Sequence, residues 1–240
     1  VKNKIHELTF FPLETKEISK RQVDYLYIDA DEDHVSLQYL EQKGDIVKPR
    51  SNTSMPKLAY VYEGVEPDAP KSQRMKLVEP KFFGGVYEGS KGVEQFWREI
   101  YDYIESTYDI TKIKKIYING DGAAWIKSGR KWIVGSTFVL DKFHMQKYII
   151  AATSHLLDSA GDARDELYHA IYKRRKCMAV ATFEKILQVT ETEAQRKKVE
   201  NSMSYILGHW EGIIQGLKNK DTQVGCSAEG HVSHIYADRL

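Results

Sequence analysis

The 240 residues suffice for one large domain or two small ones, with enough apolar material for a core. The net charge of +1 excludes a strongly basic overall field, so any contact with nucleic acid has to come from local patches. The sequence contains no run of about 18 apolar residues, so it predicts no membrane span. The two cysteines, Cys177 and Cys226, are too few for a disulfide scaffold or a cysteine-based zinc site, so we expect a protein of the reducing cytoplasm.

The first twenty residues are expected to precede the main fold. Ile5 and Leu8 lie three apart, which predicts the end of a helix over Val1–Leu8. The stretch Thr9–Arg21 contains Pro12 and alternating charges, as a linker does. Because the first residue is Val1 and no signal peptide follows it, we expect a fragment whose natural N-terminus is missing.

Three strands are expected next. The run Tyr25–Asp31 is apolar and ends in acids, and Val35–Tyr39 alternates apolar with polar residues. The segment Glu41–Met55 is rich in turn residues and predicts a loop, after which Leu58–Tyr62 predicts a third strand. The three strands together predict an antiparallel meander.

The middle of the chain combines an irregular part with a helix and two further strands. Pro67–Ser90 is rich in proline, glycine and lysine, and we expect an irregular excursion there. Apolar residues at helical spacing then predict a helix over Val93–Ile104. Lys115–Asn119 and Trp132–Leu140 predict the fourth and fifth strands, the latter with the continuous apolar content of a buried strand.

From Lys142 to about Lys220 the sequence predicts only helices. This stretch has no strand pattern, no proline and little glycine. Breaks are expected at Asp158–Asp162 and Thr190–Thr192, where small and capping residues cluster.

The end of the chain predicts one more helix, with Ser227 as its N-cap. Glu229 lies in the middle of the apolar stripe of that helix. A carboxylate on a core-facing stripe is costly to bury unless it is paired or binds a metal ion. The alternative is an acid in the first helical turn, which the helix dipole favours.

Acids at strand ends suggest a metal site. Asp31 ends the first predicted strand, Asp121 follows the fourth, and Glu229 could close the site from a helix. Carboxylates from different elements suit two Mg²⁺ ions that clamp the attacking and leaving oxygens of a phosphodiester. Asp29 competes with Asp31 because both project from the same face of the strand, and the pattern does not choose between them. Asp121 could alternatively belong to a simple turn.

Two further groups lie near these acids. Asp141 and His144, at the junction between the fifth strand and the following helix, could orient a metal-bound water or contact a phosphate, or could be an N-cap and a surface histidine. The basic loop Lys127–Lys131 could contact a DNA backbone, or could simply connect two elements.

Four motifs, in order, resemble those of the ISLre-type bacterial insertion-sequence transposases, a family related to the Mutator-like transposases. The motifs are Tyr27–Val35, Tyr117–Gly122, Leu140–His144 and Gly225–His231. The resemblance covers essentially the whole chain. It implies an α/β, ribonuclease H-like core with a mixed five-stranded sheet, flanking helices and an all-α insertion before the last catalytic helix.

The resemblance also implies a catalytic triad of Asp31, Asp121 and Glu229, with Asp29 as the alternative to Asp31. It implies that His144 and Asp141 assist. The expected division of the chain is the end of a helix-turn-helix DNA-binding region with a linker (1–20), the first part of the core (21–144), the helical insertion (145–222) and the truncated last helix of the core (223–240).

The expected function is that of a DDE transposase, an enzyme that cleaves and joins DNA at the ends of an insertion sequence. It would use two Mg²⁺ ions, for which Mn²⁺ could substitute, and would act on double-stranded DNA at the element ends and at the target. We expect an oligomer of identical chains on DNA in the bacterial cytoplasm, associated with the nucleoid. The alternatives are a ribonuclease H-like nuclease without strand transfer and an inactive DNA-binding remnant.

Overall fold

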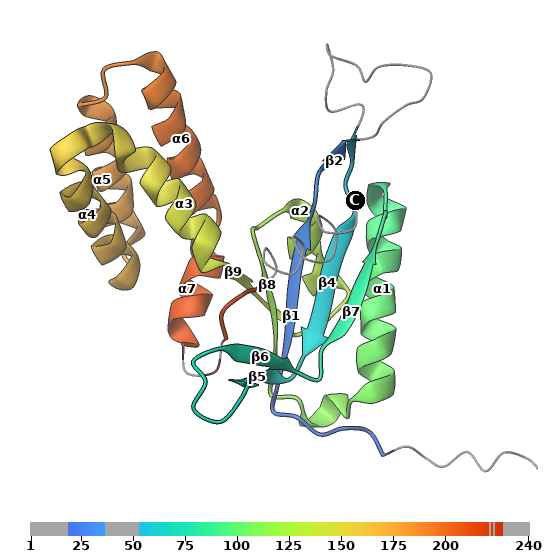
Figure 1. The fold of residues 1–240 in the computed structure, drawn as a ribbon. Helices are drawn as coiled ribbons and strands as arrows, with labels where there is room; N and C mark the ends of the chain where they lie inside the picture. The colour runs from blue at the N-terminus through green and yellow to red at the C-terminus, as the bar shows by residue number, and fades with distance from the viewer. Residues whose placement is uncertain (1–18, 37–52, 221, 223, 228–240) are drawn as a thin grey trace, which may run out of the picture.

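A central five-stranded sheet organises the part of the chain that the computed structural model describes, namely residues 19–36, 53–220, 222 and 224–227 (Figure 1). The strand order across the sheet is β7-β4-β1-β8-β9. The strands are β1 (Tyr25–Glu32), β4 (Lys57–Tyr62), β7 (Lys81–Gly85), β8 (Lys115–Gly120) and β9 (Thr137–Leu140).

The sheet is mixed. β4 pairs antiparallel with both β1 and β7, whereas β8 pairs parallel with both β1 and β9. An antiparallel half joined to a parallel half, with helices alongside, is an α/β fold compatible with a ribonuclease H-like core. The expected fold class is therefore confirmed.

Two short hairpins accompany the sheet. β2 (Val35–Ser36) pairs with β3 (Thr53–Ser54), and β5 (Gly64–Pro67) pairs with β6 (Met75–Val78). The predicted meander was wrong in its membership, because its third strand is β7 and not the strand that begins at Val35. The expectation of an irregular excursion over Pro67–Ser90 was also wrong, since β6 and β7 lie there with weakly buried, lysine- and glycine-containing sequences.

One face of the sheet is covered by α1 (Gly89–Thr107) and α2 (Ala124–Ser128). The apolar spacing of α1 buries Phe96, Trp97, Ile100 and Ile104 against that face. Alternate residues of β1, such as Leu26 and Ile28, point into the same core. The helix predicted over Val93–Ile104 is thus confirmed, with α1 extending beyond it at both ends.

The opposite face of the sheet is aromatic and polar. It carries four buried tyrosines and one fully buried carboxylate, namely Tyr27, Tyr60, Tyr62, Tyr117 and Asp29. The rings of Tyr27 and Tyr62 stack with centroids 5.3 Å apart, and those of Tyr27 and Tyr117 with centroids 5.6 Å apart. Val224 and Cys226, from the far end of the described chain, pack against this cluster. We call this surface the tyrosine face.

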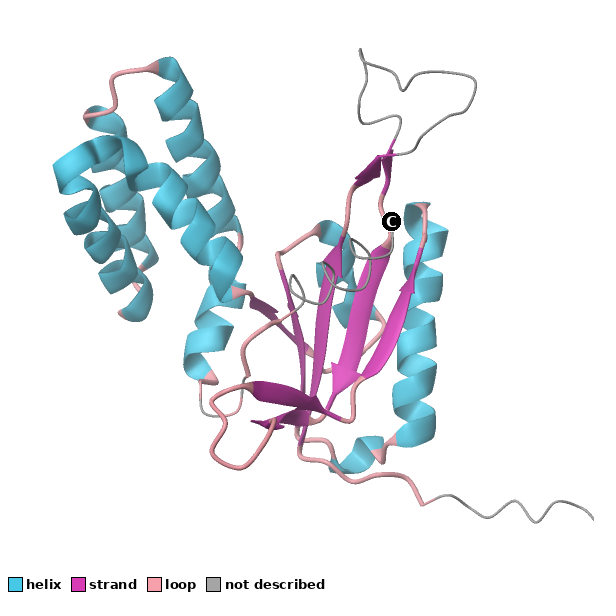
Figure 2. Cartoon of the chain, viewed as in Figure 1, coloured by secondary structure: helices cyan, strands magenta, loops and turns pink. Residues whose placement is uncertain are grey.

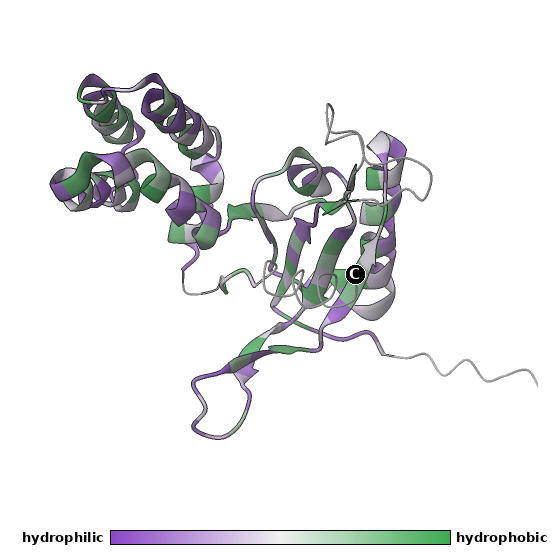
Figure 3. Ribbon diagram, turned by 45° about the horizontal axis from the view of Figure 1, so that its top comes forward, coloured by the Kyte–Doolittle hydropathy of each residue, from purple (hydrophilic) through white to green (hydrophobic). Residues whose placement is uncertain are grey.

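The helical block stands beside the β9 edge of the sheet (Figures 1 and 2). It consists of α3 (Lys142–Thr153), α4 (Ala160–Tyr172), α5 (Lys176–Gln188), α6 (Glu193–Gly208) and α7 (Trp210–Lys218). Its helices carry both hydrophobic and hydrophilic residues along their length (Figure 3). α7 packs on β9 so closely that a Cβ added at Gly212 would lie 2.8 Å from the Phe138 ring.

The all-helical stretch is confirmed within the described residues, and so is the break at Thr190–Thr192, where Thr192 and Gln195 form a capping box. The expected break at Asp158–Asp162 is a 3-10 turn (Ser154–Ser159) that leads into α4. Two further 3-10 turns in the described part of the chain, Ile110–Lys112 and Gly129–Lys131, connect other elements.

The fifth strand is shorter than predicted. It begins at Thr137, because Trp132 ends a 3-10 turn and Gly135 has a positive φ of 83°. The predicted helix end at Val1–Leu8 and the predicted helix that contains Glu229 lie outside the described residues. The expected division into 1–20, 21–144, 145–222 and 223–240 stays a prediction.

Gly120, the last residue of β8, offers a test of how tightly this sheet is packed. A Cβ there would lie 2.7 Å from the carbonyl oxygen of Ala30 and 2.9 Å from Ile126 Cδ1. We expect Gly120→Ala to lower the free energy of unfolding by about 1–3 kcal/mol, measured by urea denaturation. Gly161→Ala in α4 is the control, because nothing lies within 4 Å of its added Cβ. That variant should be unchanged or more stable by up to about 1 kcal/mol, and equal losses in both variants would contradict the packing argument.

Candidate active site

Three acids lie level with one another at the carboxyl ends of the three parallel strands. Residues 25–29 of β1 pair with residues 115–119 of β8, an offset of 90, and continuing that offset by two residues sets Asp31 beside Asp121. Residues 117–120 of β8 pair with residues 137–140 of β9, an offset of 20, and continuing it by one residue sets Asp121 beside Asp141. We call Asp31, Asp121 and Asp141 the acid row.

Asp31 is electrostatically strained in this row. Burial raises the pKa of its carboxyl to about 6, and the negative charges of Asp121 and Asp141 act in the same direction. The backbone N–H of Glu32 donates to Asp31 Oδ1 at 2.8 Å and opposes the rise, as does the neighbouring His144. A carboxylate that is held near other carboxylates is a group that a cation would stabilise.

Asp141 and His144 form a compact pair at the start of α3. Asp141 Oδ1 accepts the backbone N–H of His144 at 2.7 Å, which makes Asp141 the N-cap of the helix. Its other oxygen lies 2.7 Å from His144 Nδ1. Asp141 therefore caps the helix, as one interpretation predicted, but His144 is not a surface histidine because its side chain is only 18% exposed. A contact of this pair with a metal-bound water or a phosphate stays a prediction.

Asp29 differs from Asp31 although both lie on the same side of β1. Its carboxylate is fully buried and accepts four hydrogen bonds. The donors are Tyr62 O–H at 3.1 Å and Asn119 Nδ2–H at 2.7 Å to Oδ1, with Tyr60 O–H and the Ser227 backbone N–H, both at 2.8 Å, to Oδ2. Burial raises the pKa of Asp29, and the four donors oppose that rise.

The helical block holds the turn that follows Asp121. Tyr205 of α6 donates a short hydrogen bond to the Asp121 carbonyl, and His209 Nε2 lies 3.1 Å from the Gly122 carbonyl. A Cβ at Gly122, where φ is +91°, would lie 2.3 Å from His209 Nε2, so this contact requires glycine. The Tyr205 ring also stacks on Tyr148 of α3, with centroids 3.7 Å apart. The sequence interpretation missed Tyr205 and His209, because only the glycine after Asp121 pointed to a close approach.

After the helical block, the chain runs across the tyrosine face from the start of β8 toward the strand ends that carry the acid row. Asn219 Oδ1 accepts from Lys115 Nζ at 2.7 Å, at the beginning of β8. Farther along β1 and β8, the Tyr27 hydroxyl donates a hydrogen bond to the Thr222 carbonyl, and the Tyr117 hydroxyl is hydrogen-bonded to the Thr222 side chain. Ser227 reaches Asp29, two strand positions below Asp31. We call the part from Asn219 to Ser227 the return segment.

Glu229, the third acid of the expected triad, lies outside the described residues. Among the described residues, no group of three or more histidine, cysteine, aspartate or glutamate side chains could hold a metal ion on its own. The donors that the acid row offers are carboxylate oxygens, which are the ligands that Mg²⁺ prefers. The structure thus brings Asp31, Asp121, Asp141 and His144 together, and the role of each stays a prediction.

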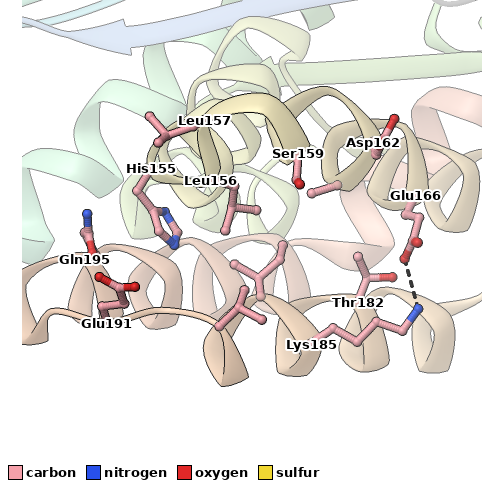
Figure 4. A pocket seen from close by; sticks show the side chains of 13 residues that line it. His155, Leu156, Leu157, Ser159, Asp162, Glu166, Thr182, Lys185, Glu191 and Gln195 are labelled. Atoms are coloured by element: carbon pink, nitrogen blue, oxygen red, sulfur yellow. Dashed lines mark hydrogen bonds and ion pairs between the residues drawn. The ribbon is translucent and has the colours of Figure 1, made fainter.

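A second hollow lies elsewhere and is chemically different. A pocket of about 590 Å³ opens within the helical block between the 3-10 turn at Ser154–Ser159 and α5–α6 (Figure 4). Asp162, Glu166 and Glu191 line it, and Glu166 is paired with Lys185 at 3.2 Å. No residue of the acid row lines this pocket, so it is not part of the candidate active site.

Comparison with known proteins gives the family. The model described as "Uncharacterised protein family (UPF0236)" matches residues 9–240. The chain belongs to the UPF0236 family. A UPF0236 protein of Caldanaerobacter subterraneus is 39% identical over 241 residues, which cover 100% of this chain and 47% of that protein. A UPF0236 protein of Streptococcus gallolyticus, named for the vanSb 3′ region, is 27% identical over 192 residues, which cover 77% of this chain and 40% of that protein.

The chain therefore spans about half the length of the curated UPF0236 relatives it matches. Among solved structures, a chain of the Drosophila P element transposase strand transfer complex is similar over 79% of this chain and 52% of its own length, with 11% identity and a TM-score of 0.28. That score is too low to carry an argument. None of the helices in the described part of the chain has the length and apolar character that crossing a bilayer requires.

The strained carboxyl of Asp31 predicts a gain in stability when its charge is removed. In the unfolded chain this carboxyl ionises near pH 4, but in the folded chain only near pH 6, so ionisation destabilises the fold above that range. We expect Asp31→Asn to raise the free energy of unfolding at pH 7 by about 1–3 kcal/mol, and the gain to disappear toward pH 4. Urea denaturation at both pH values measures it.

Asp24→Asn is the matched control, because Asp24 directly precedes β1, at the end of the strand opposite to Asp31, and forms an exposed ion pair with Lys114. An exposed pair of this kind contributes little to stability, so little change is expected at either pH. An Asp31→Asn variant that loses stability at pH 7 relative to pH 4 would contradict the electrostatic strain.

Proposed function

We propose that this chain is the catalytic part of a DNA transposase, which cleaves DNA strands and joins them to a target with Asp31, Asp121 and Glu229 as its triad. The observation that carries the proposal is the course of the return segment. Its contacts move up the sheet from Lys115 to Tyr117 and then to Asp29, toward the level of the acid row. A glutamate that continues on this path would come close to the two strand-end acids.

Chain geometry supports the delivery of Glu229. Two residues span at most about 7 Å, which limits the distance between the Cα atoms of Ser227 and Glu229. Asp31 lies two strand residues beyond Asp29, which is also about 7 Å along a strand. Since Ser227 is bonded to Asp29, Glu229 can reach the level of Asp31 in the number of residues available.

The donor set fits a pair of Mg²⁺ ions, for which Mn²⁺ could substitute. When bound, such a pair would lower the pKa of a water and stabilise the leaving 3′-oxygen of a phosphodiester. Asp31 and Asp121 would hold the pair from rigid strand ends, and Glu229 from the third side. Asp141 keeps the His144 imidazole oriented toward the row, and we propose that His144 positions the scissile phosphate or the attacking group.

DNA would reach the acid row past a basic pocket. A cavity of about 280 Å³ next to the Asp121 turn is lined in part by Lys127, Arg130, Ser136, His209 and Glu211. Lys127 Nζ lies 3.3 Å from His209 Nε2, and within the described residues the buried Ser136 hydroxyl has no hydrogen-bond partner. We propose that this pocket takes a backbone phosphate, which two cations and a hydroxyl donor can bind.

Strand transfer also has implications for the oligomeric state and the place of action. Strand transfer at two element ends requires more than one active site, so we propose an oligomer of identical chains assembled on double-stranded DNA. The place of action would be the bacterial cytoplasm, at the nucleoid.

A cleavage assay tests the triad. A supercoiled plasmid that carries the sequences flanking the gene is incubated with the protein and Mg²⁺ or Mn²⁺, and nicked, linear and joined products are resolved on a gel. We expect metal-dependent cleavage followed by joining, and a loss of at least about 10³-fold in Asp31→Asn, Asp121→Asn and Glu229→Gln, as for removal of groups that act on the transition state.

Asp24→Asn is again the control and should cleave like the wild type, because its carboxylate lies at the opposite end of β1. Cleavage without joining would support the nuclease alternative. Binding without any cleavage in either metal would support the DNA-binding remnant and overturn the proposed activity.

The basic pocket is tested by the salt dependence of DNA binding. We expect the double variant Lys127→Gln, Arg130→Gln to bind duplex DNA more weakly, and the slope of log Kd against log salt to fall by about one per cation removed, measured by fluorescence anisotropy. Lys114→Gln removes a positive charge at the other end of the sheet and should leave the slope unchanged. Equal slopes in all three proteins would contradict a phosphate contact at this pocket.

A further inference from the structure

Asp29 has a bonding arrangement that neither its place in the strand nor the expected triad explains. Both of its oxygens are engaged, each by two donors, and the carboxylate is fully buried. Asp31, by comparison, accepts the N–H of the next residue and lies in a half-buried place beside other acids. A metal ion at Asp29 would have to displace donors that are already in good geometry.

We propose that Asp29 is a positioning residue: it fastens the return segment to the sheet immediately before Glu229 and so fixes the third acid. The proposal rests on the proposed function only for the role of Glu229. The fastening itself stands on the contacts of Asp29 with Ser227 and Tyr60.

Asp29 holds Ser227 through two routes, a direct hydrogen bond from the backbone and a bridge through the Tyr60 hydroxyl. The Ser227 backbone N–H donates to Asp29 Oδ2 at 2.8 Å. The Tyr60 hydroxyl lies 2.8 Å from that same oxygen and 2.6 Å from Ser227 Oγ, so one tyrosine bridges the carboxylate and the serine. Backbone and side chain of Ser227 are thereby held at once, which fixes both the position and the direction of the chain at this point.

Burial makes the fastening selective. A buried carboxylate is costly unless donors satisfy it, and one of its four donors comes from a segment nearly 200 positions away in sequence. If the return segment leaves the sheet, Asp29 loses a donor and is uncovered at the same time. The sheet face therefore favours the docked segment over any arrangement in which Ser227 is elsewhere.

The lower contacts of the return segment act in the same direction. Thr222 is bonded to the hydroxyls of Tyr27 and Tyr117, and the side chains of Val224 and Cys226 pack on the tyrosine face. These contacts guide the chain to Asp29, but they lie farther from Glu229. Ser227 lies two residues before Glu229 in the sequence, so its anchor limits how far that acid can lie from Asp29.

Cys226 offers a direct readout, because it neighbours Ser227 and is half-buried on this face. The only other cysteine, Cys177, is exposed and is removed by Cys177→Ser. In that background we expect the rate of Cys226 labelling by a thiol reagent to rise at least about tenfold in Asp29→Asn, which keeps the size but turns one acceptor into a donor.

Three further variants separate the contributions. Ser227→Pro removes the amide donor without touching the sheet and should release Cys226 as Asp29→Asn does, which keeps the test valid where Asp29→Asn fails to fold. Tyr60→Phe removes the bridge and should give an intermediate rate. Tyr62→Phe is the matched control, because the Tyr62 hydroxyl donates to Asp29 Oδ1 and not to the oxygen that holds Ser227, so its labelling rate should stay close to that of the parent.

Cleavage at rising metal concentration distinguishes a positioning residue from a ligand. We expect Asp29→Asn to need several-fold more Mn²⁺ for half-maximal cleavage and to recover much of its activity at saturation, whereas Asp31→Asn should not recover. Faster labelling of Cys226 with such recovery supports the proposal.

Unchanged labelling in both Asp29→Asn and Ser227→Pro would overturn it, as would a loss of cleavage in Asp29→Asn that no metal concentration restores. A parent protein without cleavage would overturn the proposed function alone, because the labelling rates still decide whether Asp29 fastens the segment.

Discussion

The parallel pairing of β1 with β8, and of β8 with β9, is the constraint on which the rest of the structure depends. Its register places Asp31, Asp121 and Asp141 at one level, although 110 positions of sequence separate the first from the last. A slip by a single residue would turn the side chains of β1 to the opposite face of the sheet and move Asp31 away from the tyrosine face. The apolar residues of β1 that pack against α1 oppose such a slip, so the hydrophobic core also fixes the geometry of the polar edge.

Local patterns predicted the strands that are buried on both faces and the helix that buries one stripe. The apolar runs of β1, β4 and β8, the stripe of α1 and the proline-free stretch before Lys220 were all recognisable, because burial leaves either a continuous apolar run or a helical period in the sequence. β7 was missed since its residues are mostly exposed or half-buried and end in two glycines, which favours a loop interpretation. Acids at strand ends were predictable from position, but their common level was not, because register depends on pairing between distant segments.

The residues that contact those acids were harder to predict from the sequence. Tyr205 and His209 approach the Asp121 turn from a helix more than 80 positions away, and nothing in the spacing of α6 distinguishes them from other half-buried residues. The choice between Asp29 and Asp31 likewise depends on the donors around each carboxylate. Their bonding supports different tasks for the two acids: Asp29 is satisfied by donors from the sheet and from Ser227, whereas Asp31 lies beside further negative charge.

The helical block has a consequence for the entropy of chain closure. It leaves the sheet directly after Asp141 and returns at Asn219, so a long stretch of chain separates two points of one surface. Were that stretch flexible, bringing Ser227 back to the sheet would cost about 4 kcal/mol of loop entropy, against about 2 kcal/mol for a link of ten residues. Because α3 and α6 pack together and α7 lies on β9, the folded block behaves as a short, stiff connector. A stiff helical block thus lowers the entropic cost of bringing Ser227 back beside Asp29.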